Sequence, residues 1–146
     1  VGISSQVIAF MASVQLKIVI GTDELSSVSD AYGIIKVLSM KKVLTDLVYI
    51  PNRVSSPANG KKLYESLNYV TNKFLNRDIE FIGSISEDPI YSRAWKANNP
   101  ASIISNNTNA SAEINKIAHK IETHQAFNTT NTNNSLQFFL TGIQEN

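Results

Sequence analysis

The sequence predicts an α/β domain built around a mainly parallel sheet. Three short apolar runs, at residues 16–20, 43–50 and 79–85, alternate with longer segments in which apolar residues recur at helical spacing. This alternation is typical of βαβ units, in which a helix connects two parallel strands. Each run is almost continuously apolar, as expected for strands that helices cover on both faces. With 146 residues, 42% of them hydrophobic, the chain is long enough to bury one core.

The segments around these runs carry the apolar spacing of amphipathic helices. A short helix is predicted before the first run, and the next helix should end at the Lys41-Lys42 pair, whose charges complement its C-terminal dipole. Ser26, Ser27 or Ser29 can cap the first turn of this second helix. The apolar stripes, in chain order, are Val7, Met11 and Val14; Val28, Ala31, Tyr32, Ile35 and Leu38; Leu63, Leu67, Val70 and Phe74; and Ile114, Ile117, Ala118 and Ile121.

Two polar sequences predict where helices begin. Asn59-Gly60 is a turn signal ahead of the third stripe. Ser86-Glu87-Asp88-Pro89 has the hydroxyl cap, early acids and early proline of a helix start, with Ser86 as the cap. On the helix that follows, Tyr91 and Trp95 flank one face, and we expect both to pack in the core.

The composition changes near the C-terminus. Residues 125–135 are rich in Asn and Thr, and such a segment buries too little apolar area to offset the entropy of ordering it. We therefore assign residues 1–124 to the folded domain and residues 125–146 to a flexible tail. The tail ends in a short apolar segment, residues 136–143, that contains no Lys or Arg.

Charge and cysteine content disfavour several classes of protein. The formal net charge of +1 gives no electrostatic basis for binding nucleic acid. The absence of cysteine removes disulfides, thiolate metal sites and cysteine nucleophiles, and is compatible with a reducing cytoplasm. His119 and His124 do not share a helix face, so we expect no metal site there. The sequence has no apolar run of about eighteen residues, the length that predicts a membrane-spanning helix.

Four segments occur in an order that resembles one family. Residues 21–32 match Thr-Pro-Glu-Pro-x-Ser-x-x-Asp-Ala-Tyr, with Asp23 in place of a proline, and residues 48–54 match Val-x-Asn-Arg-Val. Residues 81–94 match Leu-Gly-x-Ile-Pro-x-Asp-x-x-Val-x-x-Ala, and the first residues match the end of Asp-x-x-Ala-Gly-Ile. Over roughly residues 1–122 the chain is similar to MinD/ParA-like P-loop ATPases, most closely to the flagellum-number regulators of the FlhG type.

The resemblance implies a fold and an activity. The expected fold is the C-terminal half of a SIMIBI-type P-loop NTPase, a three-layer α/β/α domain. The implied parent protein binds ATP with Mg²⁺, dimerises around the nucleotide and hydrolyses it, and so regulates flagellar number or placement. This chain contains no Gly-x-x-x-x-Gly-Lys-Ser/Thr motif, so we expect no catalytic residue in it, no tight phosphate or Mg²⁺ binding and no ATP hydrolysis by the chain alone.

The resemblance also implies a nucleotide-base pocket. Asn52 and Arg53 lie at the carboxyl end of the second strand, where the amide of Asn52 is placed to bond the adenine edge. Ser86, Glu87 and Asp88 belong to the loop that forms the other wall. Ser86 replaces the family's proline, which removes rigidity from the loop and adds a helix cap. For Asp88 the alternative is a purely structural role at the helix N-terminus.

Two further residues are assigned to a switch and dimer interface. Gly2 matches the family's second switch segment, and Asp30 lies in the segment near the nucleotide-sandwich interface. The alternative for Asp30 is a first-turn acid that the helix dipole stabilises by up to about 1 kcal/mol.

The implied partners are a second copy of the protein and flagellar assembly proteins such as an SRP-type GTPase, without nucleic acid. The implied location is the cytoplasm, with contact at the inner membrane through residues 136–143 as one interpretation and packing of that segment on protein as the other. Two rival functions remain open. One is a non-catalytic interaction or dimerisation module from a truncated ATPase, and the other is a plasmid-partition or division-site ATPase.

Overall fold

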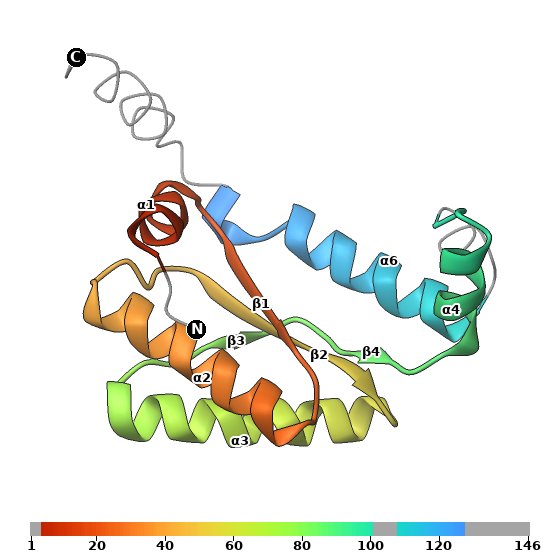
Figure 1. The fold of residues 1–146 in the computed structure, drawn as a ribbon, viewed down its shortest axis with the longest axis horizontal. Helices are drawn as coiled ribbons and strands as arrows, with labels where there is room; N and C mark the ends of the chain where they lie inside the picture. The colour runs from red at the N-terminus through yellow and green to blue at the C-terminus, as the bar shows by residue number, and fades with distance from the viewer. Residues whose placement is uncertain (1–3, 101–107, 128–146) are drawn as a thin grey trace, which may run out of the picture.

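A computed structural model describes residues 4–100 and 108–127 of the chain. In these residues a parallel sheet lies between two helical layers (Figure 1), so the predicted α/β class is confirmed. The elements are α1 (Ser5–Ser13), β1 (Lys17–Gly21), α2 (Leu25–Met40), β2 (Leu47–Val54), α3 (Pro57–Leu75), β3 (Glu80–Phe81), β4 (Ile85–Ser86), α4 (Pro89–Lys96), α6 (Asn109–Glu122) and the 3-10 turn η1 (Gln125–Phe127).

The central strand of the sheet is β2. The strand order is β1-β2-β3, and both neighbours run parallel to β2, with Lys17 opposite Leu47 and Tyr49 opposite Phe81. Further along, β2 pairs in parallel with β4. All five residues from Leu47 to Pro51 are buried, because the chain packs helices against both faces of this strand.

The two faces of the sheet carry separate cores. Helices α2 and α3 cover one face, and α6 covers the other (Figure 1). Because successive strand residues point to opposite faces, neighbouring residues of β2 enter different cores. The first core includes Val19, Ile35, Leu38, Leu47, Tyr49 and Leu67, and the second is formed by Val48, Ile50, Ile82 and Ile117. Full burial of each such aliphatic side chain contributes about 1.5 to 3 kcal/mol.

The second predicted strand begins later than its apolar run. Within residues 43–50 only the part from Leu47 onward is extended. Lys42 and Asp46 have positive φ angles of 58° and 43°, which bend the chain before the strand. Leu44 is nevertheless buried, because it fills the core beside α2 without belonging to the sheet.

The third predicted strand, residues 79–85, is split into β3 and β4. Gly83, between them, has a φ of 154°, and a Cβ there would lie 2.9 Å from Cγ1 of Ile117. A Cβ at Gly60 of α3 would in turn collide with Ser84. The segment between β3 and β4 therefore packs closely against α6 at Gly83 and against α3 at Gly60. Neither glycine position has room for a larger side chain.

Two predicted helix starts need correction. The N-cap of α2 is Glu24 and makes no side-chain cap bond; the Ser27 hydroxyl instead accepts a 2.8 Å hydrogen bond from the Thr22 N–H, ahead of the helix. Helix α3 already begins at Pro57, and Asn59-Gly60 lies within its first turn because the Ser56 hydroxyl caps the Asn59 N–H at 3.2 Å. The residue that caps each helix depends on how the preceding loop packs, and the amino-acid composition does not show this packing.

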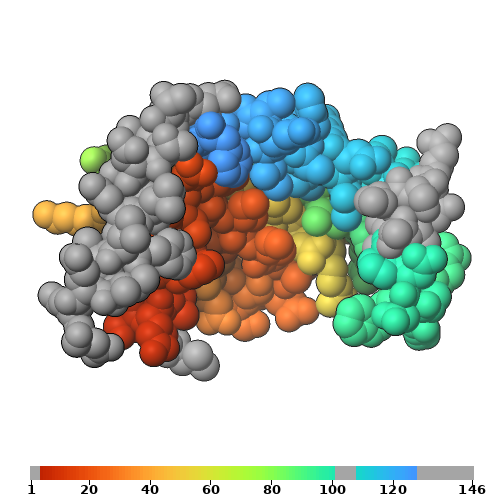
Figure 2. All heavy atoms as spheres, turned by 90° about the horizontal axis from the view of Figure 1, so that it is seen from above, coloured from red at the N-terminus to blue at the C-terminus, as the bar shows by residue number. Residues whose placement is uncertain are grey.

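Some side chains predicted as core lie on the surface. Trp95 is 86% exposed and Phe74 is 65% exposed, whereas Tyr91 is half-buried. The sequence analysis placed Phe74 in an apolar stripe and expected Trp95 to pack in the core, but the described elements leave both side chains largely uncovered. Helix α4, which carries Trp95, lies at one end of the molecule (Figure 2).

Tyr49 has a buried hydroxyl that lacks a hydrogen-bond partner among the described residues. Its side chain is fully buried, and burial raises the pKa of the phenol. The hydroxyl lies under Gly21 of β1, where a Cβ would be only 2.8 Å from it and 3.2 Å from the Ser27 oxygen. Gly21 thus leaves the room that the Tyr49 ring occupies.

We expect Gly21→Ala to lower the free energy of unfolding by about 1 to 3 kcal/mol, because it overpacks this contact. Tyr49→Phe should change stability by less than about 1 kcal/mol, since the lost hydroxyl has no partner, and it should partly rescue Gly21→Ala. Urea denaturation followed by circular dichroism measures all three variants. A loss above about 2 kcal/mol for Tyr49→Phe alone would mean that the hydroxyl is hydrogen-bonded.

Strand β1 forms one edge of the sheet in the described residues, and one of its faces is open. Lys17 and Val19 are buried toward α2, whereas Ile18 and Ile20 are 37% and 59% exposed. Burial lowers the pKa of Lys17, and Asp46 partly opposes this effect. An apolar edge strand of this kind favours pairing with further polypeptide.

We therefore expect this chain alone to self-associate through β1. Ile20→Lys should shift sedimentation equilibrium toward the monomer, because a charge on an edge strand opposes pairing. Phe74→Lys is the matched control, since Phe74 is 65% exposed on α3, outside the edge strand. A chain that stays monomeric at high concentration without substitution would contradict the prediction.

Candidate functional site

The carboxyl end of β2 meets two turns and the start of α6. In parallel sheets, ligand sites lie beyond this end of the strands. A hollow of about 540 Å³ is present here, between the β2–α3 turn, the β4–α4 turn and the first turns of α6. The predicted site residues Ser86, Glu87 and Asp88 line it. Asn52 and Arg53 lie beside it on β2 without lining it.

A bulge shapes the end of β2. Asn52 is opposite Ile85 and Val54 is opposite Ser86, so the register shifts around Arg53. Arg53 has a φ of 56°, a left-handed conformation that is uncommon for a residue other than glycine. Bulges of this kind change the direction of the neighbouring side chains. The irregular backbone therefore coincides with the two residues predicted to recognise a base.

Arg53 also connects the two walls of the site. Its Nη2 lies 3.4 Å from Oε1 of Glu87, and the two side chains are 62% and 66% exposed. Such an exposed pair contributes at most about 1 kcal/mol. The stronger connection is in the backbone, where the Glu87 N–H donates to the Val54 carbonyl at 2.9 Å.

Ser86 is held by a residue that the sequence analysis did not identify. Its N–H donates to Oε2 of Glu113 at 2.8 Å, and its hydroxyl donates to Oε1 of the same carboxylate at 2.7 Å. Glu113 lies on α6, so this pair fastens the β4–α4 turn to the helical layer on the other side. No local signal predicts it, because the two residues are brought together only by the fold.

Asp88 is the N-cap of α4, a role that the sequence analysis gave to Ser86. Its Oδ1 accepts a 2.8 Å hydrogen bond from the Ile90 N–H. The helix start was therefore predicted correctly but its cap was wrong, because Ser86 is bonded to Glu113. This hydrogen bond supports the alternative given for Asp88, a structural role at the helix N-terminus.

The two interface residues are separate from this site. Asp30 is exposed on α2, and no described hydrogen bond or ion pair joins it to the residues around the hollow. Gly2 lies outside the described residues.

The hollow is rich in hydrogen-bond acceptors. Glu87, Asp88 and Glu113 contribute carboxylates, and Ser55 and Ser56 lie on its other side. Burial raises the pKa of the Tyr91 hydroxyl, and the charges of Glu113 and Asp88 raise it further. This environment suits a neutral group with N–H and O–H donors, such as a base or a sugar, and disfavours phosphate.

Two curated proteins match the chain. It is 27% identical over 139 residues to antiactivator FleN of Pseudomonas aeruginosa, covering 95% of this chain and 49% of FleN. It is 29% identical over 93 residues to flagellum site-determining protein YlxH of Helicobacter pylori, covering 63% of this chain and 31% of YlxH. No protein-family model matches. The chain is similar to these two flagellar proteins, which agrees with its resemblance to the flagellum-number regulators among the MinD/ParA-like proteins.

This relationship agrees with the fold. The parallel sheet between helical layers is consistent with the C-terminal half of a P-loop NTPase, and the chain spans about half the length of FleN. Among residues 4–100 and 108–127, no helix is long and apolar enough to cross a membrane. Ser86 occupies the position where the resemblance leads us to expect a proline. Its two hydrogen bonds to Glu113 restrain the turn that a proline would make rigid.

We expect Glu113→Ala to lower the free energy of unfolding by about 1.5 to 3 kcal/mol, since it removes the carboxylate that accepts both bonds. The Ser86 amide should then exchange with solvent faster. Glu122→Ala, an exposed acid on the same helix, is the control. Urea denaturation and amide hydrogen exchange measure the effects. Unchanged exchange at Ser86 in Glu113→Ala would disprove the restraint.

Proposed function

We propose that the chain forms the base-binding half of a MinD-like, ATP-dependent dimeric switch that regulates flagellar number or placement. The observation that carries this proposal is the hollow at the carboxyl end of the sheet, which Ser86, Glu87 and Asp88 line. Asn52 and Arg53, the other residues that the family resemblance assigns to the base pocket, lie beside it on β2. The printed names of FleN and YlxH, an antiactivator and a flagellum site-determining protein, support the flagellar role.

Within this proposal the chain supplies recognition of the base and sugar. Asn52 offers an amide with both a donor and an acceptor, which is what the adenine edge requires. The turn that carries Ser86 forms the opposite wall, and Glu113 fixes its position. Adenine then lies between a strand end and a restrained turn, neither of which rearranges to bind it.

The phosphates and Mg²⁺ do not fit the described residues. The hollow is bordered by carboxylates, which repel a triphosphate. Among the described residues, no group of three His, Asp or Glu side chains could hold a metal ion. In our proposal a P-loop segment of the parent protein holds these groups, and ATP hydrolysis belongs to the assembled protein.

Dimerisation is proposed for the face around Asp30. This residue is exposed on α2, and Leu25 in the first turn of the same helix is 84% exposed. A second copy would cover both side chains when nucleotide is bound. The proposed partners are flagellar assembly proteins, and the proposed location is the cytoplasm with peripheral contact at the inner membrane.

Calorimetry with ATP and Mg²⁺ tests the proposal on this chain and on a version extended upstream to include a P-loop. We expect binding only by the extended version. Asn52→Ala in that version should weaken binding by about 10 to 100-fold, because a polar base contact is lost. Asn115→Ala, an exposed asparagine on α6 outside the hollow, should bind like the unmodified protein.

Two results would count against the proposal. Absence of ATP binding by the extended version would favour the non-catalytic interaction module. Equal affinity of the Asn52→Ala and Asn115→Ala variants would place the base elsewhere and leave the family relationship intact.

A further inference from the structure

The second edge of the sheet carries a groove that the proposed function does not use. Strand β3 ends the path β1-β2-β3, and no described strand pairs with its outer side. Two hollows of about 420 and 550 Å³ adjoin it, and both are lined by Phe81, Ile82 and Lys120. Since α3 and α6 lie on opposite faces, a hollow lined by both opens at the sheet edge. The two hollows share these three residues, and we refer to them together as the groove, which extends from the start of α3 to η1.

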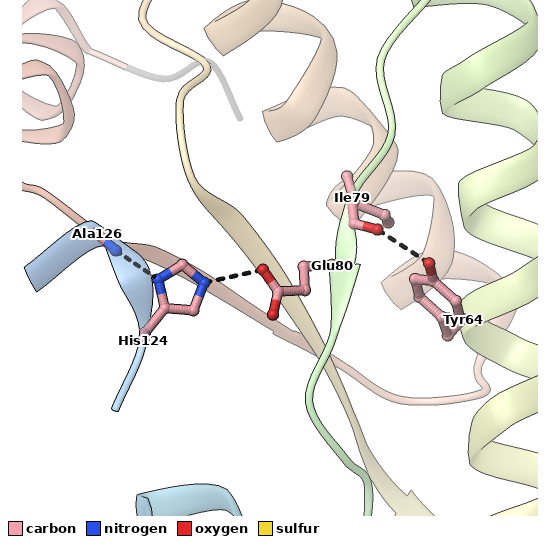
Figure 3. A network of polar contacts seen from close by, with 5 residues as sticks. All are labelled: Tyr64, Ile79, Glu80, His124 and Ala126. Carbon is pink, nitrogen blue, oxygen red and sulfur yellow. Dashed lines mark hydrogen bonds and ion pairs between the residues drawn. The ribbon is translucent and has the colours of Figure 1, made fainter. Parts of the chain in front are cut away.

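The floor of the groove is apolar and firmly held. Phe81 stacks on Tyr64 of α3, with 5.0 Å between ring centroids and an interplanar angle of 27°. The Tyr64 hydroxyl donates to the Ile79 carbonyl at 3.0 Å, as Figure 3 shows. Ile82 and Ile117 are buried beneath the groove and belong to the second core. A ligand would therefore meet a preformed apolar surface.

His124 closes one end of the groove. Its Nε2 lies 2.8 Å from Oε2 of Glu80, and its Nδ1 accepts a 3.1 Å hydrogen bond from the Ala126 N–H (Figure 3). These two bonds assign the ring proton to Nε2, so the imidazole is neutral and donates to Glu80. The buried ring thereby attaches η1 to β3 and occupies the Glu80 carboxylate.

The rim of the groove is positively charged. Lys61 from α3 and Lys116 and Lys120 from α6 line it. The lining carboxylates are Glu80 and Glu113, and each accepts hydrogen bonds from another part of the chain. These hydrogen bonds leave both carboxylates negatively charged, and Nζ of Lys61 lies 3.8 Å from Oε1 of Glu65. Lys116 and Lys120 are therefore the cations that complement acidic side chains of a ligand.

We propose that this groove binds an extended peptide of a partner protein in which apolar and acidic side chains alternate. Its backbone would pair with the outer side of β3, as in other cases of strand addition at a sheet edge. Because strand side chains alternate in direction, the apolar ones would contact Phe81 and the acidic ones would reach Lys116 and Lys120. Charge complementarity selects an acidic peptide over a basic one.

Fluorescence anisotropy tests this with a labelled peptide of about eight alternating valine and glutamate residues, long enough to form a strand. A matched peptide has lysine in place of glutamate. We expect this protein to bind the acidic peptide and not the basic one. Combined Lys116→Glu and Lys120→Glu substitution should weaken acidic-peptide binding by at least about tenfold and reverse the preference. Lys36→Glu with Lys62→Glu, on exposed positions of α2 and α3, is the charge-matched control.

A third peptide tests strand pairing. Methylation of alternate backbone nitrogens removes donors without changing charge, and it should weaken binding by about tenfold or more. The proposal is overturned if no peptide binds saturably at millimolar concentration. It is also overturned if the groove and control charge reversals have equal effects, or if the methylated peptide binds as well as the unmethylated one. Circular dichroism establishes that each variant is folded.

Discussion

The burial of β2 on both faces is the constraint on which the rest of the structure depends. A strand whose five residues from Leu47 to Pro51 are all buried needs a helical layer on each side. Helices α2 and α3 supply one layer and α6 supplies the other, so the three layers follow from one strand. The same strand positions polar residues of both sites. Asn52 lies at its carboxyl end, and Glu80 lies on the neighbouring strand β3. The candidate pocket lies at the carboxyl end of β2, and the groove lies along β3, which pairs with β2.

The fold class and the helices with long apolar stripes could be predicted from the sequence, because their periodicity reflects the layers directly. The limits of the strands could not. Leu44 is apolar and buried yet lies outside the sheet, since positive φ angles before and after it turn the chain. Gly83 interrupts an apolar run that reads as one strand. Trp95 has helical spacing and is exposed, because apolar spacing describes a helix but not what lies opposite it.

The candidate site was predictable where its residues are close in sequence and not where the fold brings them together. Residues 86–88 were predicted as one loop, and they line one hollow. Glu113 was missed because its contact with Ser86 joins two distant elements. The left-handed backbone of Arg53 was missed for a different reason: arginine does not favour that conformation, so only packing around the bulge explains it. The sequence analysis gave His124 no structural role, whereas its two hydrogen bonds make it part of the interior.

The Ser86–Glu113 pair has a consequence for how the protein is made. Synthesis proceeds from the N-terminus, and domains begin to fold as the chain leaves the ribosome. The sheet and both helices of the first core precede α4, so they leave the ribosome before α6, which covers the other face of β2. The β4–α4 turn obtains its restraint only when α6 has emerged and docked. A nascent chain therefore carries β2 before it can restrain the turn opposite its carboxyl end, and the docking of α6 completes both the second core and that restraint.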